Sequence, residues 1–443
     1  MSPFLVTSAQ AESLPAVGTL ELVPRNCSLQ GYKKKAVPEF KIGSDFIAYA
    51  SPDSTYAVTR RLMDAAKDEI IIGIYDFSAD YMKDLLLNAM KRGVTVSLML
   101  DIDSNDEQDL FDELKKFGCK AVPAPSCAAK KNRFFASAHE KIIVIDRVWT
   151  LIQSGNYSAN SIPFNEKDGG DPQHFVTGNR DMGVAIRSKP LAEFFTKLVR
   201  SDMKLELGGG DIESAVAREA RPEPDLVETV PKRIPAKLFP SKQLTPDAPV
   251  RVRLVLSPDN YMAVVPDVLR SAKKSVYIEQ QYIRSDQPEI ATLLSAIKSA
   301  RQEHPKLDVR IILGKLFSAK DVAKEKKNIA NLSKTFGLEL DTHIRYIDTS
   351  RFVHCHNKLI VIDEGTALVS SQNWSSSAVA KNREAGLVID YPDLAKYYSK
   401  IFESDWATAF RKIPIPRKRA TVSPEAVARG NFVEVRAADY QEV

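Results

Sequence analysis

The chain carries the same series of segments twice in the same order, and this duplication limits its fold more than any other feature. Self-similarity over such long segments indicates two copies of one folding unit. The matching segments are 48–77 with 254–283, 139–146 with 356–363, and 179–186 with 382–389. The sequence therefore predicts two pseudo-symmetric halves.

The 443 residues are enough for two domains of ordinary size. The first copy carries extra residues within 161–178 that the second copy lacks. The stretch between the copies opens with three glycines and contains seven prolines, which is typical of a linker. The predicted parts are an N-terminal extension at 1–45, a first repeat at 46–207, a Gly/Pro-rich linker at 208–249, a second repeat at 250–410 and a basic C-terminal tail at 411–443.

Within each copy, short apolar runs alternate with longer amphipathic segments. The runs at 142–145 and 359–362 are continuously apolar, as in strands that are buried on both faces. The other predicted strands are 69–75, 94–100, 275–282 and 309–313, and the predicted helices are 56–66, 81–91, 262–272 and 289–301. Alternation of strand and helix favours the α/β class, with a mixed sheet flanked by helices in each half.

The chain has only six histidines, and two of them begin the same pattern of His, any residue, Lys, four residues, Asp. The first pattern comprises His139, Lys141 and Asp146, and the second comprises His356, Lys358 and Asp363. An Asn follows each His at the same distance, within a stretch that contains serine, and an acidic residue comes later. These further residues are Asn156, Ser154 and Asp181 in the first copy, and Asn373, Ser371 and Glu384 in the second.

The spacing of this pattern suits chemistry on a phosphodiester. In an extended His-x-Lys segment both side chains point to the same face, so an imidazole and an ammonium face one cavity. Two such copies can bind the non-bridging oxygens through Lys, Asn and Ser donors, while one imidazole attacks phosphorus and the other protonates the departing oxygen. The segment 354–356 (HCH) could also be a metal cluster, but no partner pair of His or Cys stands at ligand spacing.

The doubled motif with its downstream Asn resembles that of the phospholipase D superfamily, over roughly 46–202 and 250–405. The resemblance implies two α/β halves that share one active site, and a two-step reaction through a phosphohistidine without metal or other cofactor. It implies that His139 is the nucleophile and His356 the general acid and base. Asp181 and Glu384 would fix the imidazole tautomers across the interface, and Asp146 and Asp363 would be structural.

The substrate is less strongly indicated than the chemistry. The segment 279–283 (EQQYI) is similar to a Glu-Asn-Gln-Tyr-Phe stretch of phospholipases D, which favours hydrolysis or transfer of a phospholipid head group. The alternative is a metal-independent nuclease that acts on DNA or RNA. The segment 130–135 (KKNRFF) could bind a nucleic-acid backbone or an anionic lipid equally well. The insertion at 161–178 is either a loop over the mouth of the site or a plain surface loop.

Composition bears on the compartment. The net charge is +5 and there are four cysteines, too few for a disulfide framework, so a reducing compartment is expected. No apolar run approaches the ~18 residues of a membrane-spanning helix. We therefore expect a protein that is cytoplasmic or peripheral to a membrane. The segment 9–11 (AQA) is also compatible with a trimmed secretion signal.

Overall fold

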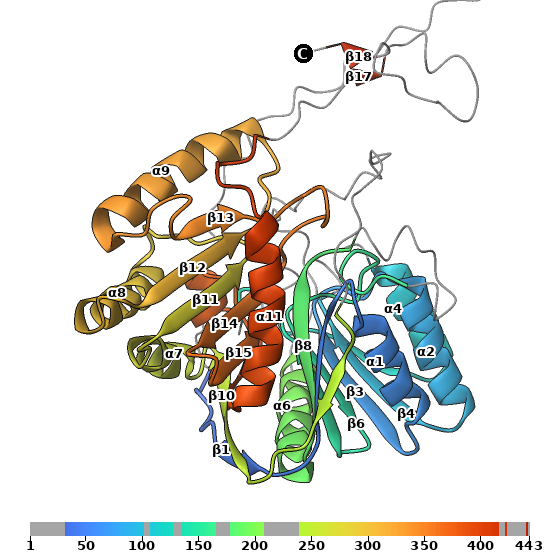
Figure 1. The fold of residues 1–443 in the computed structure, drawn as a ribbon. Helices are drawn as coiled ribbons and strands as arrows, with labels where there is room; N and C mark the ends of the chain where they lie inside the picture. The colour runs from blue at the N-terminus through green and yellow to red at the C-terminus, as the bar shows by residue number, and fades with distance from the viewer. Residues whose placement is uncertain are drawn as a thin grey trace, which may run out of the picture.

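The computed structural model describes residues 32–101, 107–126, 135–164, 178–207 and 239–415, and the short segments 421–422 and 440–441. It contains two eight-stranded mixed sheets, one for each repeat (Figure 1). The predicted α/β class with two similar halves is confirmed. The predicted helices and strands are all present, and their ends lie within two residues of the predicted ones.

The first sheet has the strand order β5-β4-β3-β6-β7-β8-β2-β9, and the second has the matching order β13-β12-β11-β14-β15-β16-β10-β1. In both sheets the three strands at one end are parallel and the rest are antiparallel. The strands of the first sheet are β2 (Phe46–Ser51), β3 (Glu69–Ile74), β4 (Thr95–Leu100), β5 (Lys120–Pro123), β6 (Lys141–Ile145), β7 (Trp149–Gln153), β8 (Asp181–Arg187) and β9 (Lys242–Leu244). Those of the second are β1 (Glu39–Ile42), β10 (Val250–Ser257), β11 (Ser275–Gln280), β12 (Asp308–Leu313), β13 (Ile344–Tyr346), β14 (Lys358–Ile362), β15 (Thr366–Ser370) and β16 (Glu384–Asp390).

The helices form an outer layer on each sheet and a middle layer between the sheets (Figure 1). The outer helices are α1 (Thr55–Asp64), α2 (Asp80–Lys91) and α4 (Gln108–Lys116) on the first sheet, and α7 (Tyr261–Arg270), α8 (Pro288–Glu303) and α9 (Ala319–Phe336) on the second. The middle helices are α6 (Lys189–Leu207) and α11 (Pro392–Thr408). A short helix, α10 (Ser376–Ala380), precedes β16, and a two-stranded pair, β17 (Thr421–Val422) and β18 (Tyr440–Gln441), lies in the tail.

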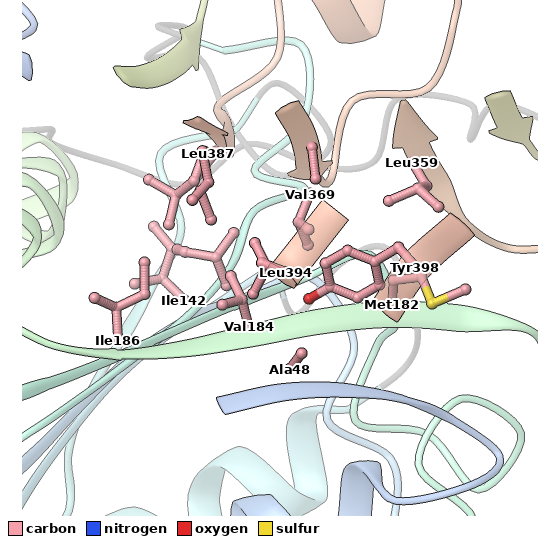
Figure 2. Packing of buried hydrophobic residues seen from close by; sticks show 14 of the residues in the cluster. Ala48, Ile142, Met182, Val184, Ile186, Leu359, Val369, Leu387, Leu394 and Tyr398 are labelled. Carbon is pink, nitrogen blue, oxygen red and sulfur yellow. The ribbon is translucent and has the colours of Figure 1, made fainter. Parts of the chain in front are cut away.

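One hydrophobic core joins the two halves. It combines Ile142 and Val184 of the first sheet with Leu359 and Leu387 of the second (Figure 2). Tyr398 of α11 also crosses the boundary, because its hydroxyl donates to the carbonyl of Gly183 at 2.7 Å. Burial of apolar surface between the sheets is the main source of their association. The halves are therefore one packed body, which fixes the motifs of one half relative to those of the other.

The edge strands depart from the predicted boundaries. β1 lies in the predicted N-terminal extension but pairs with β10 of the second sheet, and β9 lies in the predicted linker but pairs with β2 of the first sheet. Each half is thus completed by the strand that precedes the other half. These strands have only four and three residues, too short for a recognisable alternating pattern. The rest of the predicted linker, at 208–238, lies outside the described residues.

Candidate active site

The two histidine motifs meet because each half extends a short segment into the other. The backbone of Arg383 accepts a hydrogen bond from His139 N and donates one to the carbonyl of Ser137. The backbone of Arg180 makes the same pair of bonds with His356 and His354. Each motif histidine is thereby paired with the residue that precedes the acidic residue of the other half.

This pairing gives each imidazole a carboxylate from the opposite repeat. His139 Nδ1 lies 2.9 Å from Glu384 Oε2, and His356 Nδ1 lies 3.1 Å from Asp181 Oδ1. The side chains of the two histidines are only 12% and 11% exposed. In the tautomer in which Nδ1–H donates to the carboxylate, Nε2 of each ring keeps its lone pair for another partner.

The two lysines begin the buried strands β6 and β14. Lys141 Nζ donates to the carbonyl of His139 at 2.6 Å and lies over the ring of Tyr75, and Lys358 Nζ donates to the carbonyl of His356. Both lysines are completely buried. Burial lowers the pKa of Lys141 to about 7 and that of Lys358 to about 8, although the carboxylates of Glu384 and Asp181 oppose the shift. A bound anion would raise these two pKa values and so favour the charged form of both amines.

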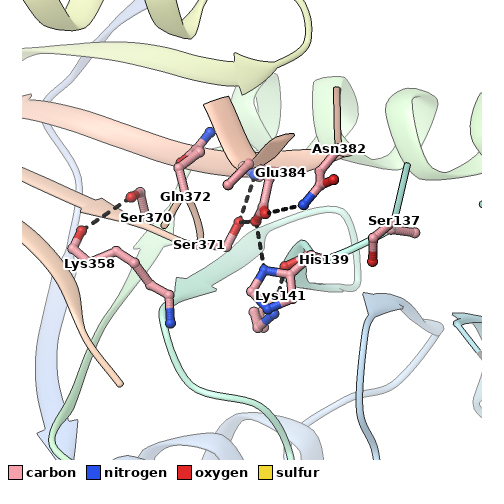
Figure 3. A network of polar contacts seen from close by, with 12 residues as sticks. Ser137, His139, Lys141, Lys358, Ser370, Ser371, Gln372, Asn382 and Glu384 are labelled. Carbon is pink, nitrogen blue, oxygen red and sulfur yellow. Dashed lines mark hydrogen bonds and ion pairs between the residues drawn. The ribbon is translucent and has the colours of Figure 1, made fainter. Parts of the chain in front are cut away.

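The two serines, which were predicted to bind phosphate, contact the carboxylates of the site. Ser154 Oγ donates to Asp181 at 2.8 Å, and Ser371 Oγ donates to Glu384 at 2.5 Å (Figure 3). Both residues are completely buried, and each hydroxyl is already engaged by a carboxylate. Asparagines come two residues later: Asn156 donates weakly to Asp76 at 3.4 Å, and the Oδ1 atoms of Asn156 and Asn373 have no partner among the described residues. The serines therefore orient the carboxylates, and the asparagines remain candidates for binding phosphate.

The aspartates of the two motifs lie away from the histidines and hold a turn. Asp146 accepts hydrogen bonds from the backbone N–H groups of Lys67, Asp68 and Glu69 at the start of β3. Asp363 accepts the equivalent bonds at the start of β11. Each aspartate begins a hairpin turn with φ above +50°, a conformation that Asp tolerates better than most residues.

A family comparison agrees with this geometry. Residues 59–203 and 265–406, more than half of the chain, match the family described as "Cardiolipin synthase, PLD-like domain". The chain belongs to the phospholipase D superfamily. The superfamily match covers both repeats, and the recognition made from the doubled motif is therefore confirmed.

The fold is similar to that of a solved phosphatidylserine synthase. Phosphatidylserine synthase from Haemophilus influenzae is 13% identical, with a TM-score of 0.59, over 84% of this chain and 88% of that chain. A polyphosphate kinase from Porphyromonas gingivalis, 12% identical, covers 83% of this chain and 50% of its own at a TM-score of 0.48. The superfamily member Nuc from Salmonella typhimurium, 20% identical, covers 36% of this chain and 95% of its own at a TM-score of 0.30. No curated protein matches the sequence significantly.

The two histidine–carboxylate pairs differ in their electrostatics. Burial opposes ionisation of Asp181, but His356, Lys358 and Ser154 outweigh it and keep the pKa of Asp181 below its ordinary value. For Glu384 burial prevails and raises the pKa to about 8. Burial and the two lysines lower the pKa of His139 well below its ordinary value, while Asp181 limits the fall for His356. Both rings therefore favour the neutral form, and His139 does so more strongly than His356.

Sequence reasoning missed several residues that build the site. Asn382 donates to Glu384 at 3.1 Å (Figure 3). The ring of Tyr75 lies 4.8 Å from that of His139. Asp101 accepts from Ser137 Oγ and Ala138 N and so fixes the approach to His139. The sequence did carry a signal for Asn382, because an Asn-Arg pair precedes the acidic residue in both copies, at 179–181 and 382–384.

Four expectations concern features beyond the histidines. In the part of the chain that the structure describes, no group of three or more His, Cys, Asp or Glu side chains could hold a metal ion. No helix among the described residues is long and apolar enough to span a bilayer. Most of the predicted mouth loop (161–178) lies outside the described residues, which omit 165–177. Most of the basic segment 130–135 lies outside them too, because they omit 127–134.

Proposed function

We propose that the protein is a phospholipase D-type phosphodiesterase that hydrolyses or transfers a phospholipid head group through a phosphohistidine. The observation that supports this best is the crossed pairing of His139 with Glu384 and of His356 with Asp181. Each carboxylate fixes Nδ1 of a ring that the other half supplies, so the paired rings function only when the halves are joined. Membership of the superfamily agrees with a phosphodiester substrate.

In the first step His139 Nε2 attacks phosphorus. The phosphorus–nitrogen bond forms as the bond to the head-group oxygen breaks, and His356 gives its Nε2 proton to that oxygen. The bound phosphodiester anion itself favours the protonated form of His356. Lys141 and Lys358 offset the charge of the non-bridging oxygens, and the amides of Asn156 and Asn373 can donate to them.

In the second step the same groups act in reverse. His356 removes the proton of water or an alcohol, whose oxygen bonds to phosphorus as the bond to His139 breaks. Water yields phosphatidic acid, and an alcohol yields a transferred lipid. The proposed charge stabilisation comes from two lysines, so we expect activity to survive chelation of divalent metals.

A product assay tests this function. Mixed micelles of phosphatidylglycerol or phosphatidylcholine with 1-butanol should give phosphatidic acid and phosphatidylbutanol, with and without EDTA. His139→Ala and His356→Ala should each reduce the rate by a factor of about 10² or more. Metal-independent cleavage of single- or double-stranded DNA, without any lipid product, would replace this proposal by the nuclease alternative.

A further inference from the structure

His354 extends the row of side chains that faces the site from the second repeat. His354 and His356 flank Cys355, whose backbone forms a parallel bridge with Arg180, so this segment is extended. Alternate side chains on an extended segment share a face, which places His354 in line with His356 and Lys358. The ring centroids of His354 and His356 are 6.5 Å apart.

The ring of His354 is held in one orientation. Its Nδ1 accepts a hydrogen bond from the backbone N–H of Lys315 at 3.0 Å, and the edge of Phe317 packs against it. Gly314 makes room for this ring, because a Cβ there would lie 2.1 Å from Cε1 of His354. Only 4% of His354 is exposed. Such packing fixes where Nε2 lies.

This orientation leaves a donor with no acceptor. Since Nδ1 accepts from Lys315, the proton of the neutral ring is on Nε2. Burial, together with the positive charges of His356, Lys315 and Lys358, lowers the pKa of His354 well below its ordinary value, so the ring is neutral. Nε2 is buried and has no hydrogen-bond partner among the described residues. A buried N–H without an acceptor is costly, and an acceptor atom of a ligand would satisfy it.

The first repeat lacks such a group. The residue that corresponds to His354 is Ser137, two positions before His139. Its hydroxyl donates to Asp101 at 3.2 Å, so it is already satisfied within the protein. The donor therefore lies on one side of the site only, the side of the proposed acid and base His356.

We propose that His354 is a specificity-determining residue whose Nε2–H donates to an acceptor atom of the alcohol on the His356 side. This inference rests on the proposed function, in which that alcohol departs as the head group in the first step and a second alcohol enters in its place. His354 would favour an alcohol with a further oxygen beside the reacting one. A simple alkyl chain, or a quaternary ammonium, has no atom that could accept the bond.

Competition between two alcohols of equal size tests this assignment. Ethylene glycol and 1-propanol have the same number of heavy atoms, but only ethylene glycol has a second oxygen. At equal concentrations with phosphatidylcholine micelles, the wild-type enzyme should form the glycol ester about threefold to tenfold faster per hydroxyl group, as expected of one neutral hydrogen bond. Because both alcohols compete for the same intermediate, the ratio of products is independent of folding and of the first step.

In His354→Ala and His354→Asn the ratio per hydroxyl group should fall to about one. Asn can keep the bond to the N–H of Lys315 through Oδ1 while losing the atom at Nε2, so it guards against a folding defect in the Ala variant. His304→Ala, at the end of α8, should keep the wild-type ratio. An unchanged ratio in both His354 variants overturns the role of His354 alone. Formation of phosphatidic acid without any transferred lipid likewise overturns the role of His354 alone. Absence of both products from the wild-type enzyme overturns the proposed function together with it.

Discussion

At the scale of single residues, two copies of one motif have unequal environments. Asp181 is an ionised partner for His356, whereas the pKa of Glu384 is raised to about 8 by its burial. The two rings therefore differ in how readily they hold a proton, although the sequences around them are nearly the same. We infer that the duplicated motif has divided into a nucleophile and an acid through residues outside the motif.

A substrate with a good leaving group separates these two roles. p-Nitrophenolate needs little protonation, so His356→Asn should still release it from a phosphatidyl p-nitrophenyl ester in a burst of one equivalent. The intermediate should then accumulate, because no base activates water, and intact-protein mass spectrometry should find the phosphatidyl adduct on His139. His139→Asn should show neither burst nor adduct. A burst from His139→Asn and none from His356→Asn would exchange the two assignments.

A second residue-scale prediction concerns Glu140, the middle residue of the first motif. Its carboxyl is 1% exposed, neither oxygen accepts a hydrogen bond from another described residue, and burial raises its pKa to about 8. A folded-state pKa above the unfolded one means that stability is greatest at low pH and is lost as pH rises toward 8. At about 1.4 kcal/mol per pKa unit, Glu140 should cost about 2–3 kcal/mol between pH 5 and pH 7.

Glu140→Gln should remove this loss, so urea unfolding at the two pH values should show a smaller difference for the variant than for the wild type. Glu403→Gln, on α11, changes a carboxyl on the outside of the fold and serves as the control. Equal pH dependence for Glu140→Gln and wild type would show that Glu140 is ionised in the folded protein or has the same pKa when unfolded.

Single-residue roles could be predicted only where the two copies agree. The histidines, lysines and acids stand at matching positions, and the resemblance supplied the crossed pairing. The serines could not be placed, because a hydroxyl beside an Asn is equally consistent with binding phosphate or orienting a carboxylate. The buried carboxyl group is also hidden by the duplication, since the first repeat has Gly73 with Glu140, and the second has Glu279 with Asn357 at the matching positions.

At the scale of elements, the aspartate of each motif couples a hairpin to the next strand. Asp363 accepts three backbone N–H groups at the start of β11 and begins the β14–β15 turn. β14 carries Lys358 at its first residue, so the same turn fixes the strand that leads into the site. Each motif thus begins with residues of the site and ends with the aspartate that fixes the strand carrying them.

Asp363→Ala should destabilise the fold by about 1–3 kcal/mol, because three N–H groups lose a charged acceptor. Asp64→Ala removes an exposed helical pair with Arg60 and should cost less than about 0.5 kcal/mol. Urea unfolding measures both values. A loss for Asp363→Ala no greater than that for the control would mean that water replaces the carboxylate without cost.

Element-scale prediction succeeded for long periodic segments and failed at the sheet edges. The continuous apolar runs of β6 and β14 predict buried strands, as the structure has them. The helices of the two repeats show clear amphipathic patterns. β1 and β9 have no such pattern, and their pairing depends on where the chain lies after both halves have assembled. That information exists only in the tertiary structure.

At the scale of the whole molecule, two buried arginines join the halves beside the site. Arg180 binds Asp53 of its own repeat at 2.6 Å and Asp405 of the other at 2.7 Å. Arg383 makes the equivalent pairs with Asp259 and Asp202. Their backbones also hold the segments of the two motif histidines, so the cohesion of the halves and the geometry of the site depend on the same residues.

Arg180→Met should therefore destabilise the protein by about 3–5 kcal/mol at pH 8, because two buried carboxylates lose their partner. Without Arg180 the folded-state pKa values of Asp53 and Asp405 should lie above their unfolded values, so the loss should shrink as pH falls to 5. Arg251→Met, which breaks an exposed pair with Glu39, should cost under about 1 kcal/mol at both pH values. Chemical unfolding at pH 5 and pH 8 measures the two variants. A cost for Arg180→Met that does not depend on pH would show that its carboxylates reach water or other donors, and that the joint between the halves relies on apolar packing alone.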